Sequence, residues 1–177
     1  MLRANVPLTQ DMGYQFGMLD GKPATGTRVS PVASAEMLMP ERLFKPLAIH
    51  REPSPDSLVF LSRQFAASIK ATILRLAQLA LWPVVFVGWK FTTRQGSTRK
   101  LRVTWSARPA GSRCYVPLNA TADPASGMYA TFSASHPTTE IESLDLGSLR
   151  GKYLVESVRV GQQVIAIVHD PRLRRRV

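Results

Sequence analysis

The chain of 177 residues has almost no cysteine and no apolar run of the length that a membrane-spanning helix needs. Cys114 is the only cysteine, which excludes an intrachain disulfide and a cluster of thiolate metal ligands. The longest nearly apolar run, residues 76–89, has fourteen residues and is interrupted by Gln78, whereas a spanning helix needs about 20. The scarcity of cysteine favours a reducing compartment over a secreted, disulfide-stapled scaffold.

The sequence also lacks the common motifs of catalysis and nucleotide binding. It contains neither a G-x-x-x-x-G-K-[ST] loop, nor a G-x-G-x-x-G turn, nor a G-x-S-x-G nucleophile elbow. None of His50, His136 and His169 has a second ligand at metal-binding spacing. The pair His169-Asp170 is predicted to be a strand end followed by a turn. We therefore predict a protein that is not an enzyme and has no catalytic, cofactor-binding or metal-binding residues.

Acidic residues are absent from the stretch Ser57–Ala122, which carries most of the excess positive charge. The whole chain has 23 Lys and Arg against 12 Asp and Glu, giving a formal charge of +11 and a pI of about 10.7. The stretch itself has ten basic residues and no acid, whereas the first 56 residues sum to zero. Crowded charges of one sign repel each other, so this distribution predicts a polyanionic partner.

Proline, glycine and apolar spacing divide the first half of the chain into an arm and a helix. Residues 1–54 contain six prolines and four glycines without a regular apolar period, which predicts an extended N-terminal arm. Ser54-Pro55-Asp56 is typical of a helix start, and apolar residues then recur at three- and four-residue spacing as far as Ala80. The spacing predicts one amphipathic helix of about 25 residues, closed by Pro83.

After Pro83 the apolar period changes to two, which predicts antiparallel strands. The first two form a hairpin whose apolar faces are Val85, Val87, Trp89 and Phe91 on one strand and Leu101, Val103, Trp105 and Ala107 on the other. Further strands are predicted at 113–118, at 128–135, and at 153–160, which pairs with 163–168 across the two-residue turn Gly161-Gln162. The expected fold is α+β and mainly β: an arm (1–54), a domain (55–171) with one long helix and a small sandwich or barrel of about six strands, and a basic tail (172–177).

The positive charge of the helix and the hairpin predicts a nucleic-acid interface, with RNA favoured. Arg outnumbers Lys seventeen to six, and the planar guanidinium suits bidentate contacts with phosphate. We expect the contacts to come from Arg63, Lys70, Lys90, Arg94, Arg99, Lys100, Arg102, Arg108, Arg113, Arg174, Arg175 and Arg176.

Two functional hypotheses follow. The favoured one is a non-enzymatic structural subunit of a large nucleoprotein assembly, either a ribosomal-type protein, including one of an organelle, or the coat protein of a virion capsid. The basic helix face and hairpin would contact the nucleic acid, and the arm would bind neighbouring subunits. The alternative is a single-pass membrane-anchored accessory subunit of a membrane protein complex. Residues 69–89 would then span the bilayer, with the following basic residues on the cytoplasmic or matrix side.

Overall fold

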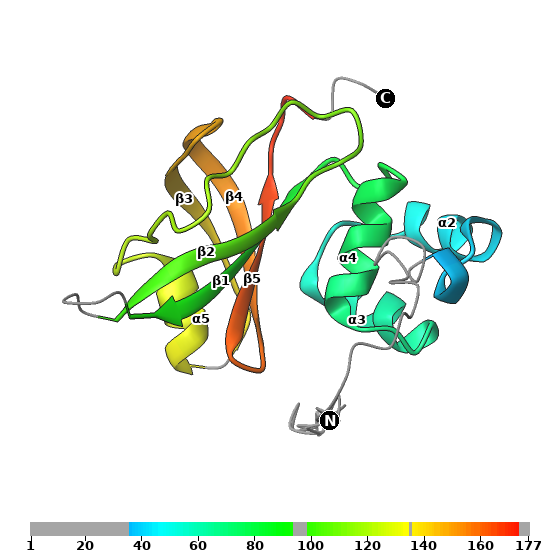
Figure 1. Cartoon of the computed structure of the whole chain (residues 1–177), viewed down its shortest axis with the longest axis horizontal. Coiled ribbons are helices and arrows are strands. Elements are labelled where there is room, and N and C mark those ends of the chain that lie inside the picture. Colours follow the sequence, from blue (N-terminus) through cyan, green and yellow to red (C-terminus); the bar gives the residue numbers. More distant parts are fainter. Residues whose placement is uncertain (1–35, 94–98, 135, 174–177) are drawn as a thin grey trace, which may run out of the picture.

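A computed structural model describes residues 36–93, 99–134 and 136–173. They form a mixed α+β fold around one open antiparallel sheet with the strand order β2-β1-β5-β4-β3. The strands are β1 (Val85–Thr92), β2 (Lys100–Ala107), β3 (Thr138–Leu146), β4 (Leu149–Val160) and β5 (Gln163–His169). Helices α2 (Glu41–Ile49), α3 (Pro55–Gln64) and α4 (Ile69–Gln78) lie together on one side of the sheet, and α5 (Gly127–Ala134) packs on the other (Figure 1).

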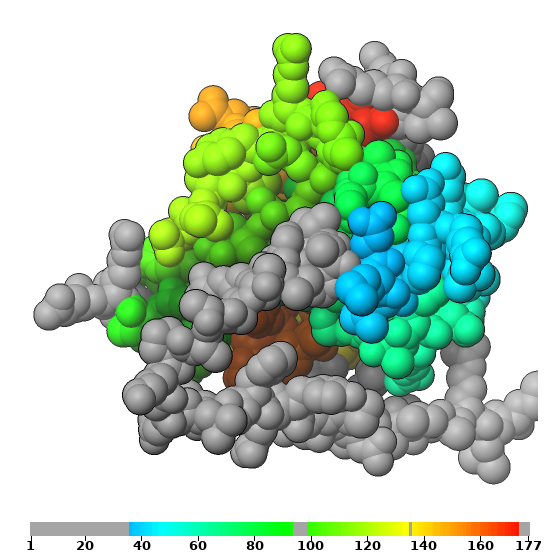
Figure 2. Space-filling view, turned by 45° about the vertical axis from the view of Figure 1, so that its right-hand side comes forward, coloured from blue at the N-terminus to red at the C-terminus, as the bar shows by residue number. Residues whose placement is uncertain are grey.

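The sheet is buried on both faces, and each face has its own apolar core. The helix-side core combines α2, α3 and α4 with strand residues such as Phe86 and Ile167. The opposite core contains Val87 and Ala166 and is covered by α5 and by the connection after β2, residues 108–126, which we call the strap. In the space-filling view the helices (blue to blue-green) and the strap (yellow-green) gather on different sides of the molecule (Figure 2).

The strap is fixed to both edges of the sheet. Next to β2, the amide of Asn119 donates to the carbonyl of Val103 at 2.9 Å, and the amide of Val103 donates to the carbonyl of Ala120 at 2.9 Å. At the β3–β4 turn, the amide of Ser148 donates to the carbonyl of Tyr115 at 2.9 Å, and the Tyr115 amide donates to Ser148 Oγ at 2.9 Å. The strap therefore bridges the two edge strands across the opposite core.

The long helix predicted from Ser54 onward is wrong, because α3 and α4 are separate. The helix start is correct: Ser54 Oγ accepts a hydrogen bond from the amide of Ser57 at 3.2 Å. Ala66 then adopts a left-handed conformation with φ 47°, and Ser68 caps α4 by accepting from the amide of Ala71 at 3.1 Å. Apolar residues of both helices pack into the same core, so the apolar spacing continues across residues 65–68. The sequence pattern therefore does not show where the first helix ends.

Part of the predicted extended arm is helical. Helix α2 lies within residues 1–54, and its Phe44 and Ala48, one helical turn apart, are fully buried in the helix-side core. Pro46 stands inside the helix, where proline is normally unfavourable, and this is why the segment reads as irregular in the sequence. The remainder of the predicted arm, residues 1–35, lies outside the described residues.

The strand predictions are correct for β1, β2, β4 and β5, whereas the sandwich or barrel of about six strands is not found in the described residues. The predicted strand 128–135 is wrong: helix α5 occupies this segment, with Met128 and Thr131 turned inward at helical spacing. The predicted strand 113–118 is an irregular part of the strap. Strand β3 escapes prediction because its first half is polar and exposed at the edge of the sheet.

The segment considered as a membrane span, residues 69–89, is divided between two different elements. Its first part is α4, its last part belongs to β1, and Pro83 lies in the connection between them. Among the helices of the described ranges, none combines the length and the apolar character that crossing a membrane requires.

Candidate nucleic-acid interface

A β-bulge in the β1–β2 hairpin decides which side chains share a face. Gly88 pairs with Trp105 and Trp89 pairs with Val103, so Thr104 is an extra residue in β2. Because of this extra residue, Val103 and Trp105 point to opposite faces of the sheet although they are two residues apart. Val103 lies in the opposite core, and Trp105 packs against the helix-side core. The predicted apolar face Leu101, Val103, Trp105 and Ala107 is therefore wrong for its last two members.

The indole of Trp105 connects the hairpin to helix α4 and to β5. It fills the space above Gly88, where an added Cβ would lie 2.2 Å from the ring atom Cε2. The indole Nε1 donates to Gln163 Oε1 at 3.2 Å. On the helix side, Lys70 Nζ lies 5.4 Å from the ring centroid, within the range of a cation–π contact. Trp105 thereby fixes the first turn of α4 beside the hairpin.

Four cations occupy the helix-facing side of the hairpin and the adjacent start of α4. Lys90 in β1 is the direct cross-strand partner of Arg102 in β2, and Lys100 lies two residues before Arg102 on the same side of the strand. Lys70 approaches from α4 over Trp105. Lys70, Lys90 and Lys100 are exposed. We call these four residues the cationic face; α4, β1 and β2 themselves contain no acidic residue.

Arg102 also has a structural role within the cationic face. It is half-buried, and its Nη1 donates to the carbonyl of Asn119 at 3.2 Å. Arg102 further pairs with Thr121 of the strap in an isolated β-bridge. Arg102 therefore helps to hold the strap against β2, which leaves the three lysines as the freely exposed charges of this face.

Two other predicted residues, Arg99 and Arg63, are exposed but do not belong to the cationic face. Arg99 is exposed beside Lys100, yet its guanidinium carbon lies 5.2 Å from the ring centroid of Phe91, which packs against the opposite core. Arg63 is exposed near the end of α3.

The remaining predicted residues are not brought to this face by the described structure. Arg108 follows the far end of β2, about 26 Å from Lys100 at roughly 3.3 Å per strand residue, and its Nε donates to the carbonyl of Ser112 at 3.1 Å. Arg113 is exposed farther along the strap. Arg94, Arg174, Arg175 and Arg176 lie outside the described residues.

One of the ten cations of the acid-free stretch, Arg75, belongs to the helix-side layer and is 1% exposed. Its Nε donates to the carbonyl of Met39 at 2.9 Å, and its Nη1 donates to Gln78 Oε1 at 2.8 Å. Its Nη2 lies 4.0 Å from Glu36 Oε1. Arg75 therefore ties the segment before α2 to α4, and its charge is not part of the exposed surface.

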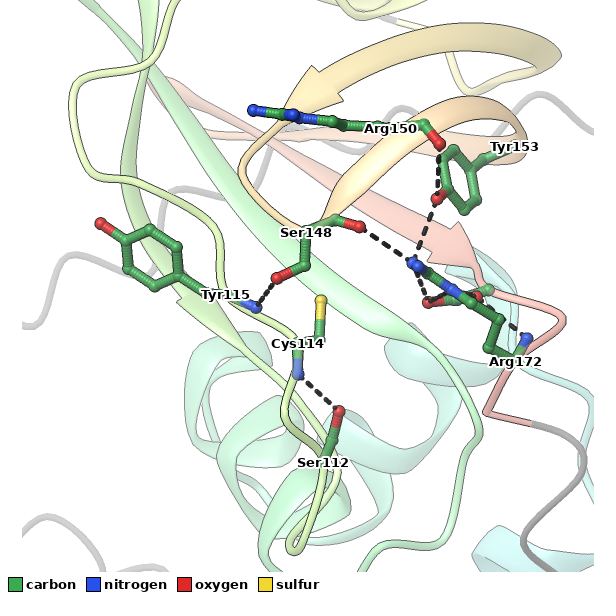
Figure 3. A network of polar contacts seen from close by, with 8 residues as sticks. Ser112, Cys114, Tyr115, Ser148, Arg150, Tyr153 and Arg172 are labelled. Carbon is green, nitrogen blue, oxygen red and sulfur yellow. Dashed lines mark hydrogen bonds and ion pairs between the residues drawn. The ribbon is translucent and has the colours of Figure 1, made fainter.

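The start of the predicted basic tail is bound into the fold. Asp170, which is 2% exposed, accepts from Arg172 Nε at 2.9 Å and from Arg172 Nη2 at 2.8 Å. The same Nη2 donates to the carbonyl of Ser148 and to Tyr153 Oη (Figure 3). The hydrogen bonds to Asp170 raise the pKa of Arg172 above its ordinary value. Arg172 is thus a structural cation, unlike the free tail residue that the sequence suggests.

Cys114 lies beside this network, in the irregular strap, and packs as a small apolar residue. It is buried in the opposite core, and its amide donates to Ser112 Oγ at 3.1 Å (Figure 3). Burial raises the pKa of the thiol, and the nearby carboxylate of Asp170 raises it further. A thiol in these surroundings is a poor nucleophile.

The histidine at the end of β5 is paired with a carboxylate. His169, the last residue of β5 as predicted, places Nε2 2.8 Å from Glu156 Oε1 on β4, and both side chains are largely buried. Within the described ranges, no group of three His, Cys, Asp or Glu side chains is arranged to hold a metal ion. The pair links two neighbouring strands.

The structure thus gathers four of the predicted phosphate-binding residues on one surface and separates the others from it. The sequence carried the charge pattern, but it had no signal for the bulge or for the role of Trp105. Comparison with protein-family models and with curated proteins finds no match to this chain. Function is therefore inferred from the geometry of the surface itself.

Proposed function

We propose that the protein is a non-enzymatic, nucleic-acid-binding structural subunit of a nucleoprotein assembly, of the ribosomal or virion-coat type. The cationic face would contact the phosphate backbone, preferably of RNA. The observation that carries this proposal is that Lys70, Lys90 and Lys100 come from three different elements to one exposed surface without an acidic residue in those elements. Such a concentration of one charge is typical of a surface that faces a polyanion.

The chemistry of the surface favours contact with the backbone over reading of the sequence. An ammonium group is a compact point charge with rotatable donors, and it binds a phosphate oxygen without selecting a base. Each phosphate neutralised releases condensed counterions, so affinity falls as salt rises. The cationic face should therefore give salt-sensitive binding in which positioning, and not catalysis, is the contribution of this subunit.

Exposed apolar side chains support a subunit that has neighbours. On and just before α2, Met37 is 79% exposed, Leu38 and Leu43 are each 55% exposed, and Ile49 is 53% exposed. Apolar side chains gathered at a surface are typical of protein–protein contacts. The part of the arm that the structure describes would therefore bind another subunit, while the hairpin on the other side of the molecule binds nucleic acid.

The experiment is a salt titration of the affinity for a labelled single-stranded RNA of mixed sequence. In the test variant Lys70, Lys90 and Lys100 are all replaced by Gln. The matched control replaces Arg42, Arg113 and Lys152 by Gln, which removes the same charge from exposed positions away from the cationic face.

The slope of log affinity against log salt should become shallower by about 2 in the test variant, since each lost phosphate contact contributes roughly 0.7 on single strands. The control should keep the wild-type slope. Equal losses in both variants would mean that total charge, and not this surface, governs binding. An unchanged slope in the test variant would overturn the proposal.

A further inference from the structure

A cavity of about 470 Å³ lies between the two edge strands of the sheet, on the side of the opposite core. Its walls come from five elements that are distant in the sequence: β1, β2, the strap, α5 and β3. Trp89, Met128 and Tyr129 provide apolar and aromatic surface, while Lys100 of the cationic face also lines the cavity. Lys100, near the start of the edge strand β2, is therefore the one residue of the cationic face that also lines this cavity on the other side of the sheet.

Two buried polar groups in the cavity wall have no hydrogen-bond partner among the described residues. They are the indole Nε1 of Trp89, whose residue is 1% exposed, and the hydroxyl of Ser126, whose residue is 7% exposed. The other two indoles, of Trp82 and Trp105, each donate to an acceptor within the protein. Buried donors are nearly always paired, because an unpaired donor has lost its hydrogen bond to water without gaining another. The unpaired N–H of Trp89 therefore points to a ligand with a hydrogen-bond acceptor.

Carboxylates of β3 and the strap line the same cavity and offer acceptors. Glu142 Oε1 accepts from the amide of Gly127 at the start of α5. Burial raises the pKa of Glu142, and the neighbouring carboxylates of Glu140 and Asp123 raise it further, although the hydrogen bond from Gly127 lowers it. Asp123 Oδ1 accepts from the amide of Ala125 at 2.9 Å. Each carboxylate has further lone pairs that these bonds do not use, so it can accept a hydrogen bond from an N–H group of a ligand.

We propose that this cavity takes up one unpaired base of the bound RNA, specifically a base that has both a carbonyl and an amino group. The inference rests on the proposed function and adds a base-binding site to it. The volume is within the range of about 300–1,000 Å³ usual for ligand sites, and the aromatic walls suit a flat ring. The carbonyl would accept from Trp89 Nε1, and the amino group would donate to Glu142 or Asp123, while Lys100 binds the adjoining phosphate.

The proposed contacts, a base carbonyl at Trp89 Nε1 and an exocyclic amino group at a carboxylate, distinguish the four bases. Guanine and cytosine each have a carbonyl together with an exocyclic amino group, whereas adenine has no carbonyl and uracil has no amino group. A base held in this way must leave its stack, which is the usual manner in which proteins read single-stranded RNA. The cavity would therefore add a preference for guanine or cytosine to the sequence-independent binding of the cationic face.

The first measurement follows the indole N–H resonances of the ¹⁵N-labelled full chain during titration with GMP, CMP, AMP and UMP. The resonance of Trp89, assigned from its loss in Trp89→Phe, should move with GMP or CMP and much less with AMP and UMP. The resonances of Trp82 and Trp105 should stay in place. No movement of the Trp89 resonance, or equal movement with all four nucleotides, would overturn the proposal.

The second measurement compares affinities for oligouridine strands that carry a single guanine, cytosine or adenine. The preference for guanine or cytosine over adenine should fall about five- to tenfold in Trp89→Phe, which retains the ring but loses the donor. Ser126→Ala, a smaller change, should reduce the preference in the same direction, and the control Trp82→Phe, in the helix-side core, should retain it. A preference that is absent in the wild type, or unchanged in both cavity variants, refutes the base site.

The salt dependence separates this proposal from the proposed function. If no base preference exists but the slope still depends on Lys70, Lys90 and Lys100, the base site is wrong and the backbone-binding surface stands. If the slope does not depend on these lysines either, both proposals fail.

Discussion

Replacing Gly88 by Ala should destabilise the fold through the indole of Trp105. The added Cβ would lie 2.2 Å from two atoms of the ring, where ordinary contacts are 3.4 Å or longer. The indole must then move away, which weakens its hydrogen bond to Gln163 and its contact with Lys70. Overpacking of this kind costs about 1–3 kcal/mol, and a lost hydrogen bond about 0.5–1.5 kcal/mol. We expect the free energy of unfolding, measured by urea denaturation, to fall by roughly 2–4 kcal/mol.

The same substitution in a Trp105→Ala background tests the cause. Without the ring, the Cβ added at position 88 meets no steric conflict from the indole, and Ala restricts the unfolded chain more than Gly does. The substitution should then be neutral or slightly stabilising, so the two changes should be coupled by about 2–4 kcal/mol, the whole of the loss expected in the wild type. An equal loss of stability in both backgrounds would refute the close packing of the indole on Gly88.

Three further predictions concern the cores and the ionisable groups. Phe44→Ala should lower the free energy of unfolding by about 3–5 kcal/mol because Phe44 is fully buried, whereas Leu43→Ala, at a 55% exposed position, should change it by less than about 1 kcal/mol in the same urea titration. Cys114 should react slowly with iodoacetamide in the folded protein and rapidly after unfolding, because its thiol is buried and its pKa is raised. Since the folded pKa of Glu142 is raised, the folded state binds a proton more readily than the unfolded state, and stability should fall as pH rises through that pKa. Urea titrations across the weakly acidic range should show this decrease in the wild type and a smaller one in Glu142→Gln.

Local signals in the sequence predict some elements correctly. Short motifs predict the helix cap at Ser54 and the turn at Gly161. The structure confirms both the helix start and the β4–β5 hairpin. Period-two alternation identifies β1 because every side chain on its face toward the opposite core is apolar. Each of these signals depends only on residues a few positions apart in the sequence. The corresponding elements can therefore be predicted without knowledge of the tertiary structure.

The errors have tertiary causes. The break at Ala66 is invisible because both helices turn their apolar side to one core, and α2 is hidden by Pro46 although Phe44 anchors it. The segment of helix α5 resembles a strand in the sequence because a short apolar segment satisfies either period. Strand β3 owes its place to pairing with β4 and has few apolar residues of its own.

The candidate surface is predictable in its charge and not in its geometry. The absence of acids between Ser57 and Ala122 identifies the correct region. It gives no indication that Arg75 is buried, that Arg102 is partly used to hold the strap, or that Arg108 lies at the other end of β2. The first two outcomes depend on hydrogen bonds to carbonyl groups that are distant in the sequence. A local sequence pattern does not predict such long-range contacts.

The most direct test of the cationic face is a map of backbone amide chemical shifts when a short single-stranded RNA is added to the ¹⁵N-labelled full chain at low salt. The largest changes should fall on residues 88–92, on residues 100–104 and on the first turn of α4, while the amides of α2 stay in place. Largest changes on α2 or on the β3–β4 turn, with the β1–β2 hairpin unmoved, would contradict the assignment of nucleic-acid binding to this face.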